Sequence, residues 1–342
     1  MSRFLDAARG KPVDVTPVWL MRQAGRSLPE YRKLRERYAL ADIVAQPELC
    51  AEVTLQPVRR LGVDAAVMFA DIMLPLRGMG VEFELVENVG PVIAKPITSV
   101  ADVEQLRVPE GEEAAPQVIT AVRHVVKESP APVICFSGAP FTLASYLIEG
   151  KPSRDFAKVK AFMFTQPRAF DRLLEKLAAT MTGYLKAQVA AGAQAVQVFD
   201  SWVGALARED YESRVLRHTR AIFAAIEPLG VPRIHFGTDT ASLLEAIAES
   251  GPDIVSLDWR LPLDEGWRRV GARLGIQGNL DPAVLLGPAE LVRERARDVL
   301  RRAGGRNGHI FNLGHGVLPE TTVENLEVLI ETVHSWVPAN VG

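Results

Sequence analysis

Short runs of apolar and β-branched residues alternate with longer amphipathic stretches along the chain. This alternation is typical of βα units arranged around a parallel sheet. It predicts an α/β protein built as a single (β/α)8 TIM-type barrel, although an open doubly wound sheet would give a similar rhythm. The expected barrel strands are residues 16–21, 65–69, 133–136, 195–199, 233–236, 253–257, 275–278 and 309–313.

Three of the helical stretches begin at a proline, which the first turn of a helix tolerates well. They are residues 47–61, 167–191 and 288–303. A different pattern occurs in residues 81–97, where the alternating run VEFELVEN is followed by Gly90 and Pro91. This pattern indicates a β hairpin inserted after the second strand. We expect it to decorate one domain that spans residues 1–342.

The composition fits a soluble enzyme. With 342 residues, 48% of them hydrophobic, the chain can bury a large core. No apolar run approaches the about 20 residues that span a bilayer, and the N-terminus lacks an apolar signal core, so we expect a cytoplasmic protein with no membrane partner. Cys50 and Cys135 are too few for a disulfide framework or a cysteine-rich metal site, and we expect both to be buried and inert.

A cluster of positive charge follows the first predicted strand. The net charge of −3 argues against a nucleic-acid partner, so an anionic ligand needs such a local cluster. Arg22 and Arg26 lie on either side of Gly25 and can clamp carboxylates, because a guanidinium binds a carboxylate through two parallel hydrogen bonds. Four further cations fit a solvated helix face, and they are Arg32, Lys33, Arg35 and Arg37.

Further polar residues follow other predicted strands, where the functional residues of a barrel lie. Asp71 is a lone carboxylate in the apolar run FADIMLPL and needs a donor or a cation as partner, unless it caps the segment that follows. Tyr146, Ser201 and His315 occur after the third, fourth and eighth strands. Each alone would also suit a structural role, but their shared position at strand ends favours a ligand site.

Residues 17–26, with the sequence PVWLMRQAGR, resemble the N-terminal signature of the uroporphyrinogen decarboxylase family. Residues 136–150 resemble the second signature of that family, and FADI, FDSWVG, IQGNLDP and FNLGHGVLP follow in the family's order over nearly the whole chain. The resemblance implies a single (β/α)8 barrel. It implies removal of the four acetate carboxyl groups of uroporphyrinogen III, giving coproporphyrinogen III and CO2 in haem biosynthesis, without a metal or organic cofactor.

The resemblance also implies the site residues and a homodimer. The substrate-binding residues are expected to be Arg22, Gln23, Ala24, Gly25, Arg26, Asp71, Tyr146, Ser201 and His315. Asp71, Arg22 and Arg26 are expected to take part in catalysis, with Asp71 accepting hydrogen bonds from the macrocycle NH groups. At Ser201 the resemblance allows serine or threonine, and either hydroxyl would serve.

Three other functions are weighed against this one. Related barrel methyltransferases bind zinc through a histidine and two cysteines, whereas Cys50 and Cys135 lie in a predicted helix and strand. A non-catalytic tetrapyrrole carrier would need the arginines but no carboxylate under the macrocycle, so Asp71 argues against it. A phosphate-binding barrel would need a glycine-rich cradle in the late loops, which this sequence lacks, and the arginines follow the first predicted strand instead.

Overall fold

The computed structural model describes residues 2–86 and 89–337. Within these residues, seven parallel strands form one curled sheet in the order in which they occur along the chain. The strands are β1 Ala66–Val67, β4 Val133–Gly138, β5 Ala195–Asp200, β6 Arg233–Gly237, β7 Ile254–Ser256, β8 Gly275–Leu280 and β9 His309–Leu313. Because the strand order never reverses, the sheet has no switch point, which excludes the doubly wound alternative.

The first predicted strand, residues 16–21, is not a regular strand, and this part of the prediction is wrong. Only Val18 forms a parallel bridge, with Phe311 of β9. On its other side, the Val18 carbonyl accepts a hydrogen bond from the Asp64 N–H at 2.8 Å. A full ladder cannot form because Pro17 has no N–H to donate. The segment still lies between the two edge strands, and the fold is an α/β barrel of the TIM type.

Polar side chains inside the barrel hold this closing segment in place. The Trp19 indole N–H donates to Gln277 Oε1 of β8 at 3.0 Å. The Gln277 amide in turn donates to Gln197 of β5 and to Ser256 of β7, at 3.0 and 2.9 Å. All four side chains are buried, and hydrogen bonds in such a low-dielectric interior are strong. They tie three strands to the closing segment.

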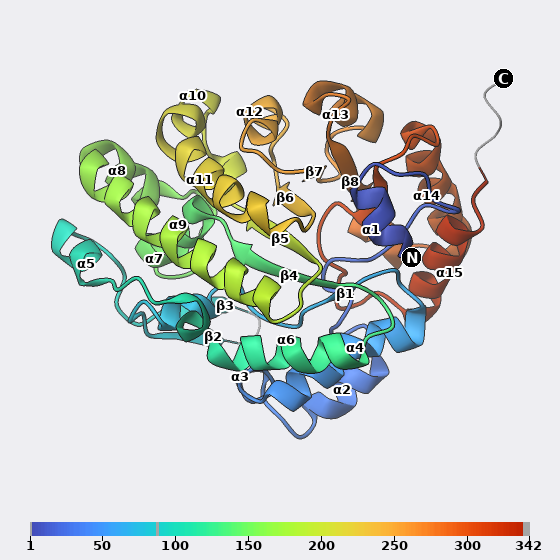
Figure 1. Cartoon of the computed structure of the whole chain (residues 1–342), viewed down its shortest axis with the longest axis horizontal. Helices are drawn as coiled ribbons and strands as arrows, with labels where there is room; N and C mark the ends of the chain where they lie inside the picture. Colours follow the sequence, from blue (N-terminus) through green and yellow to red (C-terminus); the bar gives the residue numbers. More distant parts are fainter. Residues whose placement is uncertain (1, 87–88, 338–342) are drawn as a thin grey trace.

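Helices lie around the outside of the strands (Figure 1). The helix α4 has its predicted bounds, α9 ends one residue earlier than predicted, and α14 begins after Pro288, which is its N-cap. The helices are α1 Arg3–Ala8, α2 Pro29–Arg35, α3 Leu40–Ala45, α4 Pro47–Leu61, α5 Val100–Gln105, α6 Pro116–Glu128, α7 Pro140–Glu149, α8 Ala157–Thr165, α9 Pro167–Ala190, α10 Arg208–Asp210, α11 Leu216–Ile226, α12 Leu244–Ala248, α13 Leu263–Val270, α14 Ala289–Ala303 and α15 Val323–His334. Among these described helices, none combines the length and the hydropathy needed to cross a membrane.

The predicted hairpin after β1 is confirmed, and it supports a helix of the site. Its antiparallel strands are β2 Phe83–Val86 and β3 Gly90–Ile93. Residues 87–88, which the prediction also included, lie outside the described residues. The Ile93 N–H donates to the Gly150 carbonyl, directly after α7, at 2.8 Å. The hairpin therefore buttresses the helix that carries Tyr146.

Lys176 of α9 is a buried cation that caps a neighbouring helix. Its Nζ donates to the carbonyls of Val103, Glu104 and Leu106, at 2.9, 3.0 and 2.9 Å. These carbonyls end α5, where helix carbonyls lack partners within the helix. We expect Lys176→Met to lower the free energy of unfolding by about 2–4 kcal/mol, because the carbonyls lose a charged donor. Urea unfolding measures this loss, and an equal loss in Lys186→Met, at an exposed position of α9, would contradict the capping role.

Candidate active site

A row of aromatic rings crosses the barrel near the carboxyl ends of the strands. Phe136 of β4, Phe199 of β5 and Phe236 of β6 pack edge to face, with ring centroids 5.2 and 5.6 Å apart. Phe236 also contacts the ring of His315, which follows β9, at 6.1 Å. Edge-to-face packing is the favoured geometry for such rings. Phe199 and His315 are partly exposed, whereas Phe136 and Phe236 are buried. These four rings, here called the aromatic floor, form an apolar layer that Phe199 and His315 present to the site.

Asp71 follows β1, and only one of its carboxylate oxygens is occupied. Its Oδ1 accepts a hydrogen bond from the Met73 N–H at 2.8 Å, so the residue does cap the segment that follows. Its Oδ2 accepts no hydrogen bond from any residue within 2–86 or 89–337. Burial raises the pKa of Asp71, while the Met73 N–H and the charge of Arg22 act in the opposite direction. One carboxylate oxygen is therefore available to a donor from a ligand.

The helix α4 holds the backbone just before Asp71. The Cys50 thiol donates to the Phe69 carbonyl at 2.8 Å, and the Phe69 N–H donates to Thr54 Oγ1 at 2.9 Å. Burial raises the pKa of Cys50 to about 12, so it remains a thiol. Cys50 and Cys135 are both buried, as expected. Cys50 has a structural role that its sequence context did not reveal, because it positions the loop that carries Asp71.

Arg22 links the predicted residues electrostatically. Its positive charge acts to lower the pKa of Asp71, Tyr146 and His315. These residues lie after β1, on α7 and after β9, so the fold brings distant parts of the chain together around one guanidinium. The backbone of Arg22 has a φ of 59°, in the left-handed region that non-glycine residues seldom adopt.

Gln23 braces the turn that carries Arg22. Its side chain is fully buried. Its Oε1 accepts a hydrogen bond from the Leu20 N–H, and its Nε2 donates to the Ala65 carbonyl just before β1, both at 3.0 Å. The side-chain amide is thus occupied by the protein, and the backbone N–H of Gln23 donates to the Leu20 carbonyl at 3.0 Å. A contact between Gln23 and a ligand stays a prediction.

The residues of this turn differ in exposure, and Arg22 itself is exposed. Ala24 is buried, Gly25 is partly exposed and Arg26 is exposed. The guanidinium of Arg32, on α2, donates to the carbonyls of Arg26 and Ser27 at 2.8 and 3.1 Å. Arg32 therefore fixes the end of the turn, a role that the prediction of a solvated helix face missed.

Tyr146 packs against Trp202, which directly follows Ser201 in the chain. The ring centroids of Tyr146 and Trp202 are 6.0 Å apart, and those of Phe156 and Trp202 are 5.5 Å apart. The Trp202 N–H donates to the hydroxyl of Thr142, one helical turn before Tyr146, at 3.1 Å. Burial raises the pKa of Tyr146 to about 12, so its hydroxyl stays protonated at neutral pH. Ser201 directly precedes Trp202 and is partly exposed.

His315 follows β9 and is a neutral imidazole at neutral pH. Its pKa is lowered to about 4, first because burial disfavours the charged ring and then because Arg22 and Arg260 are close. Asp258 acts in the opposite direction. A neutral imidazole offers one donor and one acceptor to a ligand.

An ion-pair network beside His315 was not found by sequence reasoning. Arg260 Nε and Nη1 bind Asp239 and Asp258, each at 2.8 Å. Arg22, Phe156 and Asp239 are the non-glycine residues with positive φ in the described chain, at 59°, 52° and 57°. Arg22 acts on His315, Phe156 packs against Trp202 and Asp239 binds Arg260. Strained backbone of this kind concentrates at functional sites. The only signal in the sequence was the position of the LDWR run after a predicted strand.

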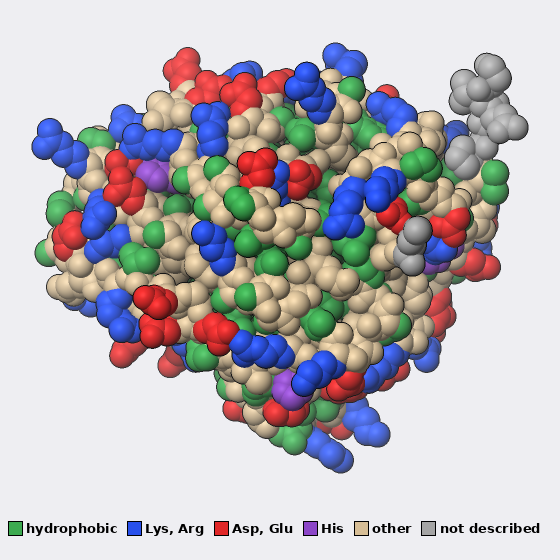
Figure 2. All heavy atoms as spheres, viewed as in Figure 1, with side chains coloured by type: hydrophobic (Ala, Val, Ile, Leu, Met, Phe, Trp, Pro, Cys, Tyr) green, Lys and Arg blue, Asp and Glu red, His purple; other side chains and the backbone are tan. Residues whose placement is uncertain are grey.

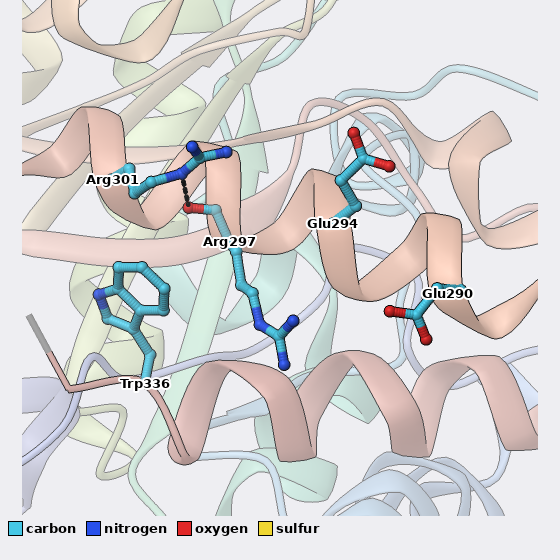
Figure 3. Close-up of a pocket in the computed structure, with 5 residues that line it drawn as sticks. All are labelled: Glu290, Glu294, Arg297, Arg301 and Trp336. Carbon is cyan, nitrogen blue, oxygen red and sulfur yellow. Dashed lines mark hydrogen bonds between the residues drawn. The ribbon is translucent and has the colours of Figure 1, made fainter.

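The surface away from this face carries a separate groove. Positive and negative side chains are interspersed over the face in Figure 2. A groove of about 380 Å³ is lined by Trp336 and four charged residues of α14, among them Arg297 and Arg301 (Figure 3). It contains none of the predicted site residues. Within the described residues, no three histidine, cysteine or acidic side chains are placed to hold a metal ion.

Comparisons with known proteins agree on one family. The family described as Uroporphyrinogen decarboxylase (URO-D) matches residues 1–336. A uroporphyrinogen decarboxylase of Carboxydothermus hydrogenoformans is 51% identical over 97% of this chain and 95% of its own. One from Thermus thermophilus is 54% identical over 96% of both chains, and one from Sorangium cellulosum is 53% identical over 97% and 96%.

Solved structures of low sequence identity share the fold alone. A methyltransferase from Methanosarcina mazei superimposes with a TM-score of 0.81, at 19% identity and 96% coverage of both chains. A B12-independent methionine synthase from Shewanella sp. W3-18-1 gives a TM-score of 0.57, at 12% identity over 86% of this chain and 87% of the other.

Proposed function

The chain belongs to the uroporphyrinogen decarboxylase family, and we propose that Asp71 and Arg22 are the groups that carry its reaction. As a member, it is a carboxy-lyase of tetrapyrrole biosynthesis that converts uroporphyrinogen to coproporphyrinogen and CO2. The observation that carries the proposal is the free Oδ2 of Asp71, a partly buried acceptor close to Arg22.

The chemistry of the substrate suits this arrangement. A tetrapyrrole macrocycle has apolar faces, which match the aromatic floor of Phe136, Phe199, Phe236 and His315. Its pyrrole NH groups are hydrogen-bond donors without strong acceptors of their own, and Asp71 Oδ2 supplies one. Its carboxylate arms need cations, which Arg22 and Arg26 supply at the same end of the barrel.

The role of Asp71 follows from the charge that develops during decarboxylation. An acetate arm cannot release CO2 until its pyrrole accepts the electron pair, which requires a proton on the ring carbon and gives a cationic ring. Loss of CO2 sends the electron pair into the ring and leaves an exocyclic methylene. A second proton converts this methylene to a methyl, and the ring carbon then releases the first proton to restore the pyrrole. Each turn thus exchanges one carboxylate and one net proton for CO2 and a methyl group. Asp71 stabilises the cation electrostatically, and such stabilisation acts mainly in the transition state.

The remaining predicted residues orient the arms. Tyr146 and Ser201 contribute hydroxyls, and the neutral imidazole of His315 contributes a donor or an acceptor. Arg22 and Arg26 hold the arms through bidentate hydrogen bonds. Arginine stays charged in proteins, so a proton delivered at this site comes from bound water in contact with the guanidinium rather than from the guanidinium itself.

The organisation of the protein is part of the proposal. The chain acts as one domain over residues 1–342 and as a cytoplasmic homodimer in which the active-site faces meet. Light scattering at micromolar concentration tests the dimer, and a mass of one chain alone would reject it.

An anaerobic assay with uroporphyrinogen III and a chelator tests the function. The products are separated by their remaining carboxyl groups, and we expect the four-carboxyl product to accumulate despite the chelator. Tight binding without turnover would instead support the carrier alternative and would remove the role proposed for Asp71.

A further inference from the structure

We propose that residues 312–317, at the end of β9 and in the loop that follows it, position Arg22, with Asn312 and Gly316 as the positioning residues. The proposal rests on the function proposed for Arg22 above. It assigns to Asn312 and Gly316 a role in the reaction without contact with the substrate.

Asn312 holds the backbone next to Arg22. Its Oδ1 accepts hydrogen bonds from the Met21 N–H at 3.1 Å and from the Leu313 N–H at 2.8 Å. From the same segment, the Val317 N–H donates to the Met21 carbonyl at 2.8 Å. Both backbone groups of Met21 are therefore bound to residues 312–317. Asn312 is fully buried, so water does not compete for these bonds.

The backbone of Arg22 needs such support. A φ of 59° is unfavourable for a residue with a Cβ and persists only where the surroundings enforce it. Met21 is held on one side of Arg22 by Asn312 and Val317, and Gln23 is held on the other side by Leu20 and Ala65. The left-handed conformation of Arg22 is thus fixed from both sides.

Gly316 determines where the side chain of Arg22 lies. A Cβ at Gly316 would lie 2.3 Å from Arg22 Cδ, 2.7 Å from Cγ and 3.1 Å from Cβ. The first two distances are too short for non-bonded carbon atoms, so the stem of Arg22 lies directly against the glycine. The absence of a side chain at Gly316 lets the guanidinium remain near Asp71 and His315. Glycine is required here for space, because its φ lies outside the positive range.

Gly316→Ala tests this positioning because the added methyl must push the arginine stem aside. We expect kcat/KM to fall about 100-fold with little change in Tm, since a displacement of about 1 Å at a reacting group costs that much. Gly287→Ala is the matched control. Its new Cβ would lie 2.8 Å from Cδ2 of Leu291, an exposed side chain on α14 that can move into solvent, and we expect unchanged kinetics.

A spectroscopic measurement separates displacement of Arg22 from a general loss of structure. Arg22, Arg260 and Asp258 are the charged groups that act on the pKa of His315, and Arg22 lowers it. In Gly316→Ala, we expect the NMR titration midpoint of His315 to rise toward the value in Arg22→Gln. Asn312→Ala, which removes the acceptor for the Met21 N–H, should move it in the same direction.

The outcomes are distinguishable. An unmoved His315 midpoint in Gly316→Ala overturns the proposal, whether or not activity falls, because a displaced guanidinium must change the field at the imidazole. A raised midpoint with kcat/KM within about threefold of the wild type also overturns it, since the position of Arg22 would then not matter for the reaction. If Arg22→Gln itself retains normal kinetics, the function proposed for Arg22 fails. The titration of His315 in Gly316→Ala then decides by itself whether residues 312–317 position Arg22.

Discussion

Asp71→Asn is expected to lower kcat by about 100- to 1,000-fold, the usual cost of removing one electrostatic contact from a transition state. The asparagine keeps the shape of the side chain and an oxygen that can accept the Met73 N–H. It removes the negative charge that the cationic ring requires. With the amide oxygen held by the Met73 N–H, the NH2 group replaces Oδ2 and cannot accept a hydrogen bond from a pyrrole N–H. The carboxylate arms of the substrate are still held by Arg22 and Arg26, so KM should change less than kcat.

The free energy of unfolding of Asp71→Asn, unlike its kcat, should not fall. Burial raises the pKa of Asp71 in the folded protein, so its ionised form is less favourable there than in the unfolded chain. The carboxylate therefore lowers stability progressively as the pH rises above the pKa of an ordinary aspartate, and the cost is complete above the raised pKa. At neutral pH, Asp71→Asn should be at least as stable as the wild type. A loss of stability together with activity would indicate a structural role instead.

Activity should also depend on pH through Asp71. Only the ionised carboxylate stabilises the cation, so kcat/KM should fall as the pH drops through the raised pKa of Asp71, at a higher pH than for an exposed aspartate. Glu331→Gln, on an exposed face of α15, removes the same charge away from the site and should leave both kcat and the acid limb unchanged. Normal turnover in Asp71→Asn would reject charge stabilisation by this residue.

The regular parts of the barrel could be predicted because local signals determine them. Pro47 and Pro167 mark helix starts, and buried apolar runs mark β4, β5 and β6. The closing segment could not be predicted, since Val18 pairs with Phe311 only through tertiary packing and Pro17 prevents a ladder. Apolar patterning reports burial, and residues 16–21 are buried like a strand without being one.

The same distinction between local signals and tertiary contacts applies to the site. The rule that functional residues follow barrel strands located Asp71, Tyr146 and His315, and the structure brings them to one guanidinium. The same rule could not reveal the left-handed backbone of Arg22 or the space that Gly316 leaves for it. Both depend on contacts between the two ends of the chain, which no local pattern records.

Arg22→Gln is expected to lower kcat/KM by about 1,000-fold. Two charge-assisted hydrogen bonds to an arm of the substrate contribute about 1.5–3 kcal/mol each, and about 1.4 kcal/mol corresponds to a factor of ten. The loss of its positive charge should also raise the pKa of Asp71 and of His315, since Arg22 acts to lower both. The acid limb of kcat/KM should therefore move to higher pH. Arg297→Gln, in the surface groove, removes an equal charge and should change neither quantity.

Arg22→Lys separates the two contributions of this residue. A lysine keeps the positive charge but cannot form two parallel hydrogen bonds with one carboxylate. The acid limb of Arg22→Lys should lie near that of the wild type, because the positive field at Asp71 is largely retained. Its KM should be higher than that of the wild type, because the arm of the substrate is held less well. An acid limb that is unmoved in Arg22→Gln would show that the charge does not reach Asp71. Equal kinetics in the lysine variant and the wild type would show that the charge alone suffices and that the planar fork has no part in binding the arm.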